Sequence, residues 1–94
     1  MSTPLIVSRH PGAIQWLQQH YPWLSSAEIK ESVSAEDVTN RVVAGNLPLS
    51  LAALCGEFHS IEFQGVPPRG AEYTADDMVL AGARLTRYRV ERVD

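Results

Sequence analysis

A hydroxyl, a guanidinium and an imidazole stand side by side near the start of the chain, at Ser8, Arg9 and His10. Side chains of these types suit chemistry on a phosphate group. The arginine can hold two phosphate oxygens through parallel hydrogen bonds, and an imidazole can donate or accept a proton. The serine hydroxyl can bind a phosphate oxygen or a ribose hydroxyl. Structural roles are the alternative: a surface ion pair for Arg9, a bond to a backbone carbonyl for His10, and the closing of a turn for Ser8.

Two further segments carry residues that suit a bound anion, the step Gly45-Asn46-Leu47-Pro48 and the loop that holds Arg69 and Gly70. Each follows a strand-like run and leads toward a helix start, where unpaired N–H groups face anions. Glycines in these segments, and Gly12, would let a ligand approach the backbone closely. Asn46 can contact a base or a sugar, or it can occupy a left-handed turn; Arg69 can close over a ligand or stay solvated. No segment has the Gly-x-x-x-x-Gly-Lys pattern, which disfavours hydrolysis of nucleoside triphosphates.

Hydrophobic periodicity predicts the elements that must position these residues. Pro11 suits the first turn of a helix, and Pro22 would end that helix. The predicted order is a buried strand over 4–8, a helix over 11–21, an edge strand over 27–34, a turn or single helical turn over 35–40, a strand over 41–47, a short helix over 48–56, a strand over 58–63 and a loop over 64–73. Such alternation predicts an α/β fold with a mostly parallel sheet of about four strands flanked by helices.

The C-terminal part of the sequence predicts one long helix over 75–93, with Thr74 as its N-cap and acidic residues in its first turn. At about 100° per residue, one stripe of this helix would face the core. The members of that stripe are Met78, Ala81, Leu85 and Tyr88. The arginines of the same segment spread over more than half of the helix and would form a solvated face; they are Arg84, Arg87, Arg89 and Arg92.

Length and composition limit the classes of protein. A chain of 94 residues predicts a single domain over 1–94. The formal net charge of −3 argues against binding to duplex nucleic acid. Cys55 is the single cysteine and is expected to be a buried small hydrophobic residue. His20 and His59 share no metal-ligand spacing with His10, so no metal and no cofactor are expected. We also expect no signal peptide, no membrane span and a cytoplasmic location.

Three blocks of the sequence resemble one known family. The blocks "IVSRHPGAIQWL", "VVAGNLPLSLAAL" and "RGAEYTADDMVLAGARLTRYRVER" are similar to the signature blocks of small accessory proteins encoded with type III CRISPR systems. The resemblance covers most of the chain and is weakest across residues 22–40. The second block departs from the family, where a Gly-Thr-Leu-Pro-like step is usual and Asn46 stands here in the place of the threonine.

This resemblance implies a function. The family looks related to CRISPR-associated Rossmann-fold sensors, which implies a small Rossmann-like domain, and its members are assigned as ring nucleases that cleave cyclic oligoadenylate, chiefly cyclic tetra-adenylate. Such cleavage needs no metal: the ribose 2′-hydroxyl attacks the neighbouring phosphate. Arg9 would stabilise the charge on phosphate, His10 would protonate the leaving oxygen and Ser8 would orient the phosphate. A nearly symmetric ring suggests a homodimer. Two alternatives are a non-catalytic binder of the cyclic nucleotide and an adaptor for the CRISPR effector that uses Trp16 and Trp23.

Overall fold

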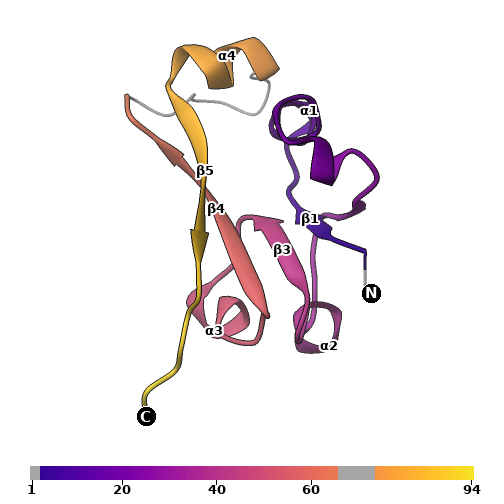
Figure 1. Ribbon diagram of the computed structural model, residues 1–94, viewed down its shortest axis with the longest axis vertical. Helices are drawn as coiled ribbons and strands as arrows, with labels where there is room; N and C mark the ends of the chain where they lie inside the picture. The colour runs from indigo at the N-terminus through magenta and orange to yellow at the C-terminus, as the bar shows by residue number, and fades with distance from the viewer. Residues whose placement is uncertain (1–2, 66–73) are drawn as a thin grey trace.

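The computed structural model describes residues 3–65 and 74–94. Within them, the chain forms a mixed α/β domain around one five-stranded sheet (Figure 1). The strands are β1 (Leu5–Val7), β2 (Glu28–Lys30), β3 (Val42–Gly45), β4 (Glu57–Phe63) and β5 (Ala83–Tyr88). The helices are α1 (Pro11–His20), the 3-10 helix η1 (Pro22–Leu24), α2 (Ala35–Val38), α3 (Leu49–Ala52) and α4 (Ala75–Leu80). The α/β class and the mostly parallel sheet are therefore confirmed, with five strands rather than about four.

The order of the strands across the sheet is β2-β1-β3-β4-β5. The first four strands run parallel, and β5 pairs antiparallel with β4. The chain moves from β1 to β2 in one direction and from β3 to β4 in the other, so the connection order reverses between β1 and β3. In open α/β sheets, ligands bind beyond the carboxyl ends of the strands at such a reversal. In this chain the reversal lies between residues 5–7 and 42–45.

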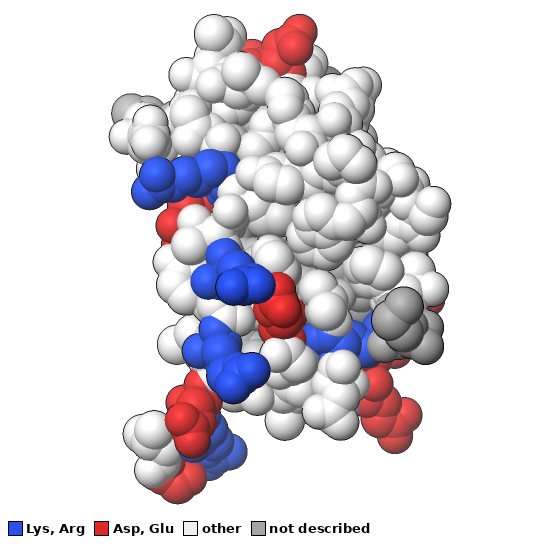
Figure 2. Space-filling view, viewed as in Figure 1, with Lys and Arg blue, Asp and Glu red and all other residues white. Residues whose placement is uncertain are grey.

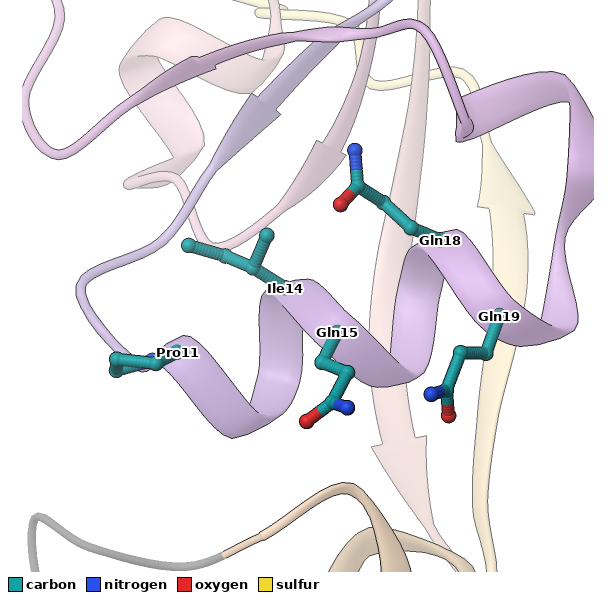
Figure 3. Close-up of a pocket in the computed structure, with 5 residues that line it drawn as sticks. All are labelled: Pro11, Ile14, Gln15, Gln18 and Gln19. Carbon is teal, nitrogen blue, oxygen red and sulfur yellow. The ribbon is translucent and has the colours of Figure 1, made fainter.

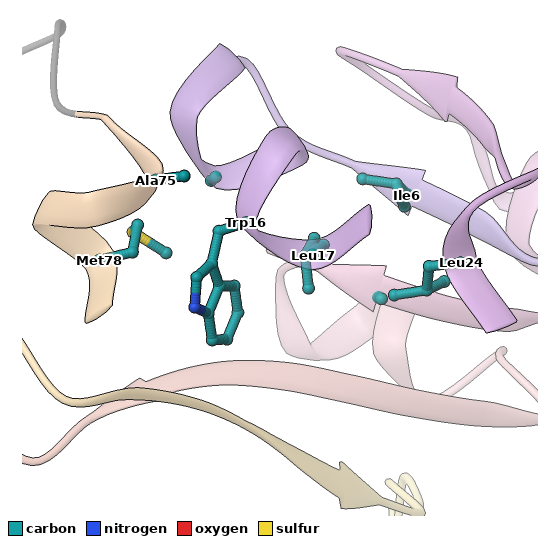
Figure 4. Close-up of a cluster of buried hydrophobic side chains, with 8 residues drawn as sticks. Ile6, Trp16, Leu17, Leu24, Ala75 and Met78 are labelled. Atoms are coloured by element: carbon teal, nitrogen blue, oxygen red, sulfur yellow. The ribbon is translucent and has the colours of Figure 1, made fainter. Parts of the chain in front are cut away.

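Helices cover both faces of the sheet. Successive side chains of a strand point to opposite faces, so each face has its own cluster of buried apolar residues. One core cluster lies between the sheet and the pair α1 and α4, with Trp16, Leu17 and Met78 almost fully buried (Figure 4). The other lies on the opposite face against α2 and α3 and contains Val38 and Phe58. Figure 1 shows the same division, with α1 and α4 together at one end of the view and α2 and α3 at the other. The short strand β1 is buried on both faces, as expected for a central parallel strand.

The first helix follows the sequence closely. It begins at Pro11, which lacks the N–H that would stay unpaired there, and it ends at His20 before Pro22 opens the 3-10 turn. Trp16 also faces the core and is only 2% exposed. The predicted edge strand and the single helical turn after it are also present, as β2 and α2. The helix predicted over 48–56 is shorter and ends at Ala52.

The long C-terminal helix predicted over 75–93 is wrong. Helix α4 ends at Leu80, Gly82 adopts a positive φ of 73°, and the chain then forms β5. A glycine in the left-handed region ends helices commonly, because it has no Cβ to clash. Beyond it, alternation replaces the helical period: Leu85 packs toward the α1 side, whereas Tyr88 lies on the opposite face and is 41% exposed.

Met78 is buried as predicted, but from a helix of six residues. The arginines predicted on a helix face lie on β5 and on the segment after it. Within residues 3–65 and 74–94, every helix is too short or too polar to cross a lipid bilayer.

Candidate functional site

The loops after β1 and β3 begin side by side. Val7 pairs with Gly45 in the parallel register, and the backbone N–H of Asn46 donates to the carbonyl oxygen of Val7 over 3.1 Å. Gly45 has a φ of 125°, and a Cβ built on it would lie 2.1 Å from that same carbonyl oxygen. Only a glycine therefore lets the two strands approach this closely. The close pairing brings the polar residues after β1 next to Asn46.

A cavity of about 210 Å³ lies at this edge of the sheet and is lined by Val7, Ser8, Arg9, His10, Glu31 and Asn46. An adjoining hollow of about 250 Å³ shares Asn46 and is lined also by Gly45, Leu47, Pro48, Phe58 and Ser60. The structure thus brings together two of the three segments that the sequence predicted to meet. Arg69 and Gly70, from the third segment, lie outside the described residues. Gly12 is buried in the first turn of α1 and is not among the residues that line either hollow.

Ser8 holds the turn that leads into α1. Its side chain is almost fully buried, with the residue 4% exposed, and its Oγ accepts a hydrogen bond from the backbone N–H of His10 over 3.1 Å. The backbone N–H of Ser8 donates to the carbonyl oxygen of Lys30 over 3.1 Å, which ties the turn to β2. Ser8 therefore fixes the backbone from which Arg9 and His10 project. Arg9 is exposed and His10 is half-buried.

The start of α1 adds a favourable environment for an anion. His10 is the N-cap residue, and its side chain makes no capping hydrogen bond. The first hydrogen bond within the helix runs from the N–H of Ile14 to the carbonyl oxygen of His10. The backbone N–H groups before Ile14 therefore lie ahead of the hydrogen bonds of the helix itself. The aligned peptide dipoles of a ten-residue helix place partial positive charge at this end. This end of the helix begins two residues after Arg9 in the chain.

The sequence interpretation missed Glu31. This residue follows β2 directly and lines the cavity with Arg9 and His10. Its place could have been found from the parallel order, because the residue after each parallel strand falls at the same edge of the sheet. A carboxylate repels phosphate but accepts hydrogen bonds from hydroxyl and amino groups. The cavity therefore offers a cationic side chain for phosphate and an anionic one for a sugar hydroxyl or an exocyclic amine.

A third hollow, of about 380 Å³, lies on the outer side of α1 and is lined by Pro11, Ile14, Gln15, Gln18 and Gln19. Figure 3 shows Gln15 and Gln19 one helical turn apart and directed the same way. The amide of Gln18 is engaged, since its Nε2 donates to the carbonyl oxygens of Leu24 and Ser25 over 3.4 Å each. This groove begins at Pro11, the residue directly after His10 in the chain, and follows the helix.

The other residues singled out from the sequence lie away from this edge. Burial raises the pKa of the Cys55 thiol, and its Sγ lies 3.6 Å from the carbonyl oxygen of Leu51. His20 packs on the ring of Trp16, with ring centroids 5.8 Å apart. His59 bonds to Glu57, with 2.7 Å between Nε2 and Oε1. Across residues 3–65 and 74–94, no three His, Cys, Asp or Glu side chains come together in a way that could hold a metal ion.

The fold and the cavity define an open, mostly parallel α/β domain with a polar hollow at its topological switch point, where ligands bind in sheets of this class. Residues 5–91 match the family model described as "Putative CRISPR-associated protein (Cas_VVA1548)", and the chain belongs to that family. The association with CRISPR systems that the resemblance implied is thereby confirmed. No curated protein and no solved structure matches the chain. The family description states neither an activity nor a substrate.

Proposed function

We propose that this protein is a ring nuclease that cleaves cyclic oligoadenylate, with cyclic tetra-adenylate as the preferred substrate, and so switches off type III CRISPR signalling in the cytoplasm. One observation carries the proposal: Arg9, His10 and Asn46 line a single cavity at the switch point of the sheet. The CRISPR-associated family supports the biological setting. The relation to the CRISPR-associated Rossmann-fold sensors is part of the same proposal.

The proposed reaction is an internal transfer. The ribose 2′-oxygen attacks the adjacent phosphorus and loses its proton, the bond from phosphorus to the 5′-oxygen breaks, and that oxygen gains a proton. The products are a 2′,3′-cyclic phosphate and a 5′-hydroxyl. The protein must hold the attacking oxygen, the phosphorus and the leaving oxygen in line. It must also stabilise the charge that develops on the phosphate oxygens, without help from a metal ion.

The cavity residues divide these tasks by charge. The guanidinium of Arg9 and the N-terminal end of α1 attract the phosphate. His10 donates the proton to the leaving 5′-oxygen, a step that typically contributes about 10²- to 10⁴-fold in rate. Glu31 accepts a hydrogen bond from a ribose hydroxyl and orients it. Ser8 acts through the backbone, because its buried hydroxyl already accepts the N–H of His10.

The groove on α1 supplies contacts suited to adenine. Pro11 and Ile14 offer apolar surface against the face of a base. The amides of Gln15 and Gln19 each carry a donor and an acceptor, which is the pattern that pairs with the edge of adenine. Figure 3 shows the side chains that would contact the base, of which Pro11 stands two residues after Arg9 in the chain.

A homodimer completes the proposal. The cavity of about 210 Å³ is smaller than the roughly 300–1,000 Å³ pockets that enclose drug-sized ligands. A ring of four nucleotides is larger than such a ligand, so one cavity cannot enclose it. Two copies related by a two-fold axis would present the same cavity twice to a nearly symmetric ring. We therefore expect the protein to bind one ring between two copies.

The test is a cleavage assay with purified protein. Cyclic tetra-adenylate is incubated with the protein in excess EDTA, and the products are separated by chromatography and identified by mass. A linear product that ends in a 2′,3′-cyclic phosphate supports the proposal. An intact ring after hours at micromolar protein would reject the enzymatic part of it.

One observation favours a second candidate function, binding without cleavage. The hydroxyl of Ser8 is buried and already accepts the N–H of His10, so one of the three side chains predicted to act on the phosphate serves the fold instead, which weakens the case for cleavage more than the case for binding. A protein that only sequesters the ring would show tight binding by calorimetry and an intact ligand.

The adaptor alternative loses one of its two anchors, since Trp16 is 2% exposed and belongs to the core.

A further inference from the structure

We propose that the outer edge of β5 is a binding surface for single-stranded nucleic acid, with phosphates on Arg87 and Arg89 and a base on the ring of Trp23. This surface is separate from the cavity at Arg9. In the antiparallel register Arg87 lies opposite His59, near the start of β4, whereas Arg9 lies beyond the carboxyl end of β1. The inference therefore does not depend on the proposed ring nuclease.

The charge of the chain is strongly uneven. Four of its eight basic residues fall within 84–92, whereas two of its eleven acidic residues fall after position 82. A chain with a net charge of −3 thus carries a locally basic edge. In Figure 2 the blue side chains, with red ones between them, follow one another down the part of the face that β5 and the C-terminal segment occupy in Figure 1. Rows of this kind track a phosphate backbone.

A hollow of about 340 Å³ opens on this edge and is lined by Gly56, Glu57, Arg87, Tyr88 and Arg89. Arg87 and Arg89 are two residues apart on a strand or its extension, so their side chains point to the same side. The Arg87 side chain is 73% exposed and lies 3.9 Å from the carboxylate of Glu57, a weak and solvated ion pair. The guanidinium of Arg87 is therefore not committed to holding the fold together. Arg89 is exposed as well, so both are accessible to an external phosphate.

An aromatic ring, that of Trp23, is linked to Arg87 through His59. The ring of Trp23 is 41% exposed and lies on His59, with centroids 4.8 Å apart. His59 is fixed in turn by Glu57 through a 2.7 Å hydrogen bond, and it stands directly opposite Arg87 in the register. A half-exposed indole near cationic side chains is a combination that binds single strands, because a base can stack while its phosphate is neutralised.

The same features argue for a single strand over a duplex. A duplex keeps its bases stacked and offers only phosphates to this edge, and the acidic remainder of the molecule would repel its second strand. The carboxylates on the edge must be counted as well. Glu57 faces Arg87, and Glu62 accepts hydrogen bonds from Thr86 and from the Tyr88 hydroxyl on the opposite face. Binding is therefore expected to be weak and strongly dependent on salt.

The test measures fluorescence anisotropy of a labelled single-stranded RNA of about 12 nucleotides and mixed sequence, within the usual site sizes. The full chain should bind it, and Arg87→Glu with Arg89→Glu should weaken binding at least tenfold. The dependence of log K on log salt should become shallower by about 1.4, since each lost phosphate contact removes about 0.7 for a single strand. The neutral pair Arg87→Gln and Arg89→Gln is the second variant if the charge reversal does not fold.

A second readout uses the two tryptophans. Trp16 is buried and Trp23 is exposed, so RNA that stacks on Trp23 should quench emission in the wild type and not in Trp23→Phe. Arg9→Ala is the matched control and should bind the RNA as the wild type does. Unchanged affinity in the paired arginine variants would overturn the proposal. So would equal binding of a duplex, or loss of binding in Arg9→Ala, which would place the RNA at the other site.

Discussion

The carbonyl oxygen of Val7 lies only 2.1 Å from the position that a Cβ on residue 45 would occupy, so this position requires a glycine. This close approach joins the ends of β1 and β3, the two strands between which the order of the strand connections reverses. It also sets the spacing between the loop that carries Arg9 and the loop that carries Asn46. The cavity between them therefore depends on a glycine that itself offers no chemistry.

Replacement of this glycine should disrupt both the fold and the site. We expect Gly45→Ala to lower the free energy of unfolding by at least about 3 kcal/mol, because a backbone clash adds to the strain of a φ of 125° in a residue with a Cβ. Urea denaturation measures the change. The control is Asn46→Ala, an exposed neighbour whose replacement should cost little stability. A loss below about 0.5 kcal/mol for Gly45→Ala would mean that the two strands do not approach this closely.

Loss of the Ser8 hydroxyl should act on stability as well as on cleavage. In Ser8→Ala the backbone N–H of His10 loses its partner in a partly buried turn. We expect a loss of about 1–3 kcal/mol in the free energy of unfolding and a slower cleavage of cyclic tetra-adenylate. The exposed Ser50→Ala on α3 is the matched control. If Ser8→Ala kept full stability but lost cleavage, Ser8 would contact the substrate directly and the role assigned to it would be wrong.

The change from helix to strand at Gly82 can be tested by whether replacement of this glycine raises or lowers the stability of the protein. With Gly82 at a φ of 73°, Gly82→Ala should destabilise the protein by about 1–2 kcal/mol, and Gly82→Asn should cost less. In an uninterrupted helix over 75–93, the same alanine would instead stabilise by about 1 kcal/mol. Thermal denaturation of the two variants distinguishes these structures. Stabilisation by alanine would contradict the strand β5.

Most of the fold could be predicted because each element of the parallel part has a recognisable pattern in its own short stretch of sequence. The buried run of β1, the proline limits of α1 and the polar edge strand β2 each carry their own signal. The segment after Gly82 could not be assigned in this way, because Leu85 has a place in both a helical stripe and an alternating strand. Pairing with β4 decides between them, since Glu62 lies opposite Arg84 and bonds to Thr86 and Tyr88 across the strands. That pairing joins residues far apart in sequence, which local patterns do not report.

The candidate site was predictable to a similar extent. Ser8, Arg9, His10 and Asn46 come together because residues after parallel strands fall at one edge of the sheet. Glu31 was missed because its side chain forms no motif by itself. The reversal of strand order between β1 and β3, which marks the cavity, appears only once the order of all strands is known.

One pH dependence follows from a surface carboxylate beside β2. Asp37 accepts hydrogen bonds from the backbone N–H of Ser34 and from Lys30, which lower its pKa from the ordinary value of 3.8. A lowered pKa in the folded state contributes stability above the unfolded value and loses it as the pH falls through the folded value. The wild type should therefore lose more stability than Asp37→Asn on passing from about pH 5 to about pH 2.

Urea denaturation at the two pH values measures this difference. The effect is expected to be small and reduced by salt, because the carboxylate is on the surface. Glu36→Gln, at the neighbouring exposed position, is the control and should follow the wild type. An Asp37→Asn variant with the same acid sensitivity as the wild type would show that these bonds do not form in solution.

The most direct test of the central claim compares cleavage of cyclic tetra-adenylate by the wild type and by Arg9→Ala in the presence of EDTA, with folding of both checked by circular dichroism. Arg9 is exposed, so its replacement should leave stability nearly unchanged. We predict a linear product with a 2′,3′-cyclic phosphate from the wild type and a rate at least roughly 10²-fold lower for Arg9→Ala, the usual cost of removing one donor to a developing oxyanion. Equal rates for the two proteins, or no product from the wild type, would contradict the account.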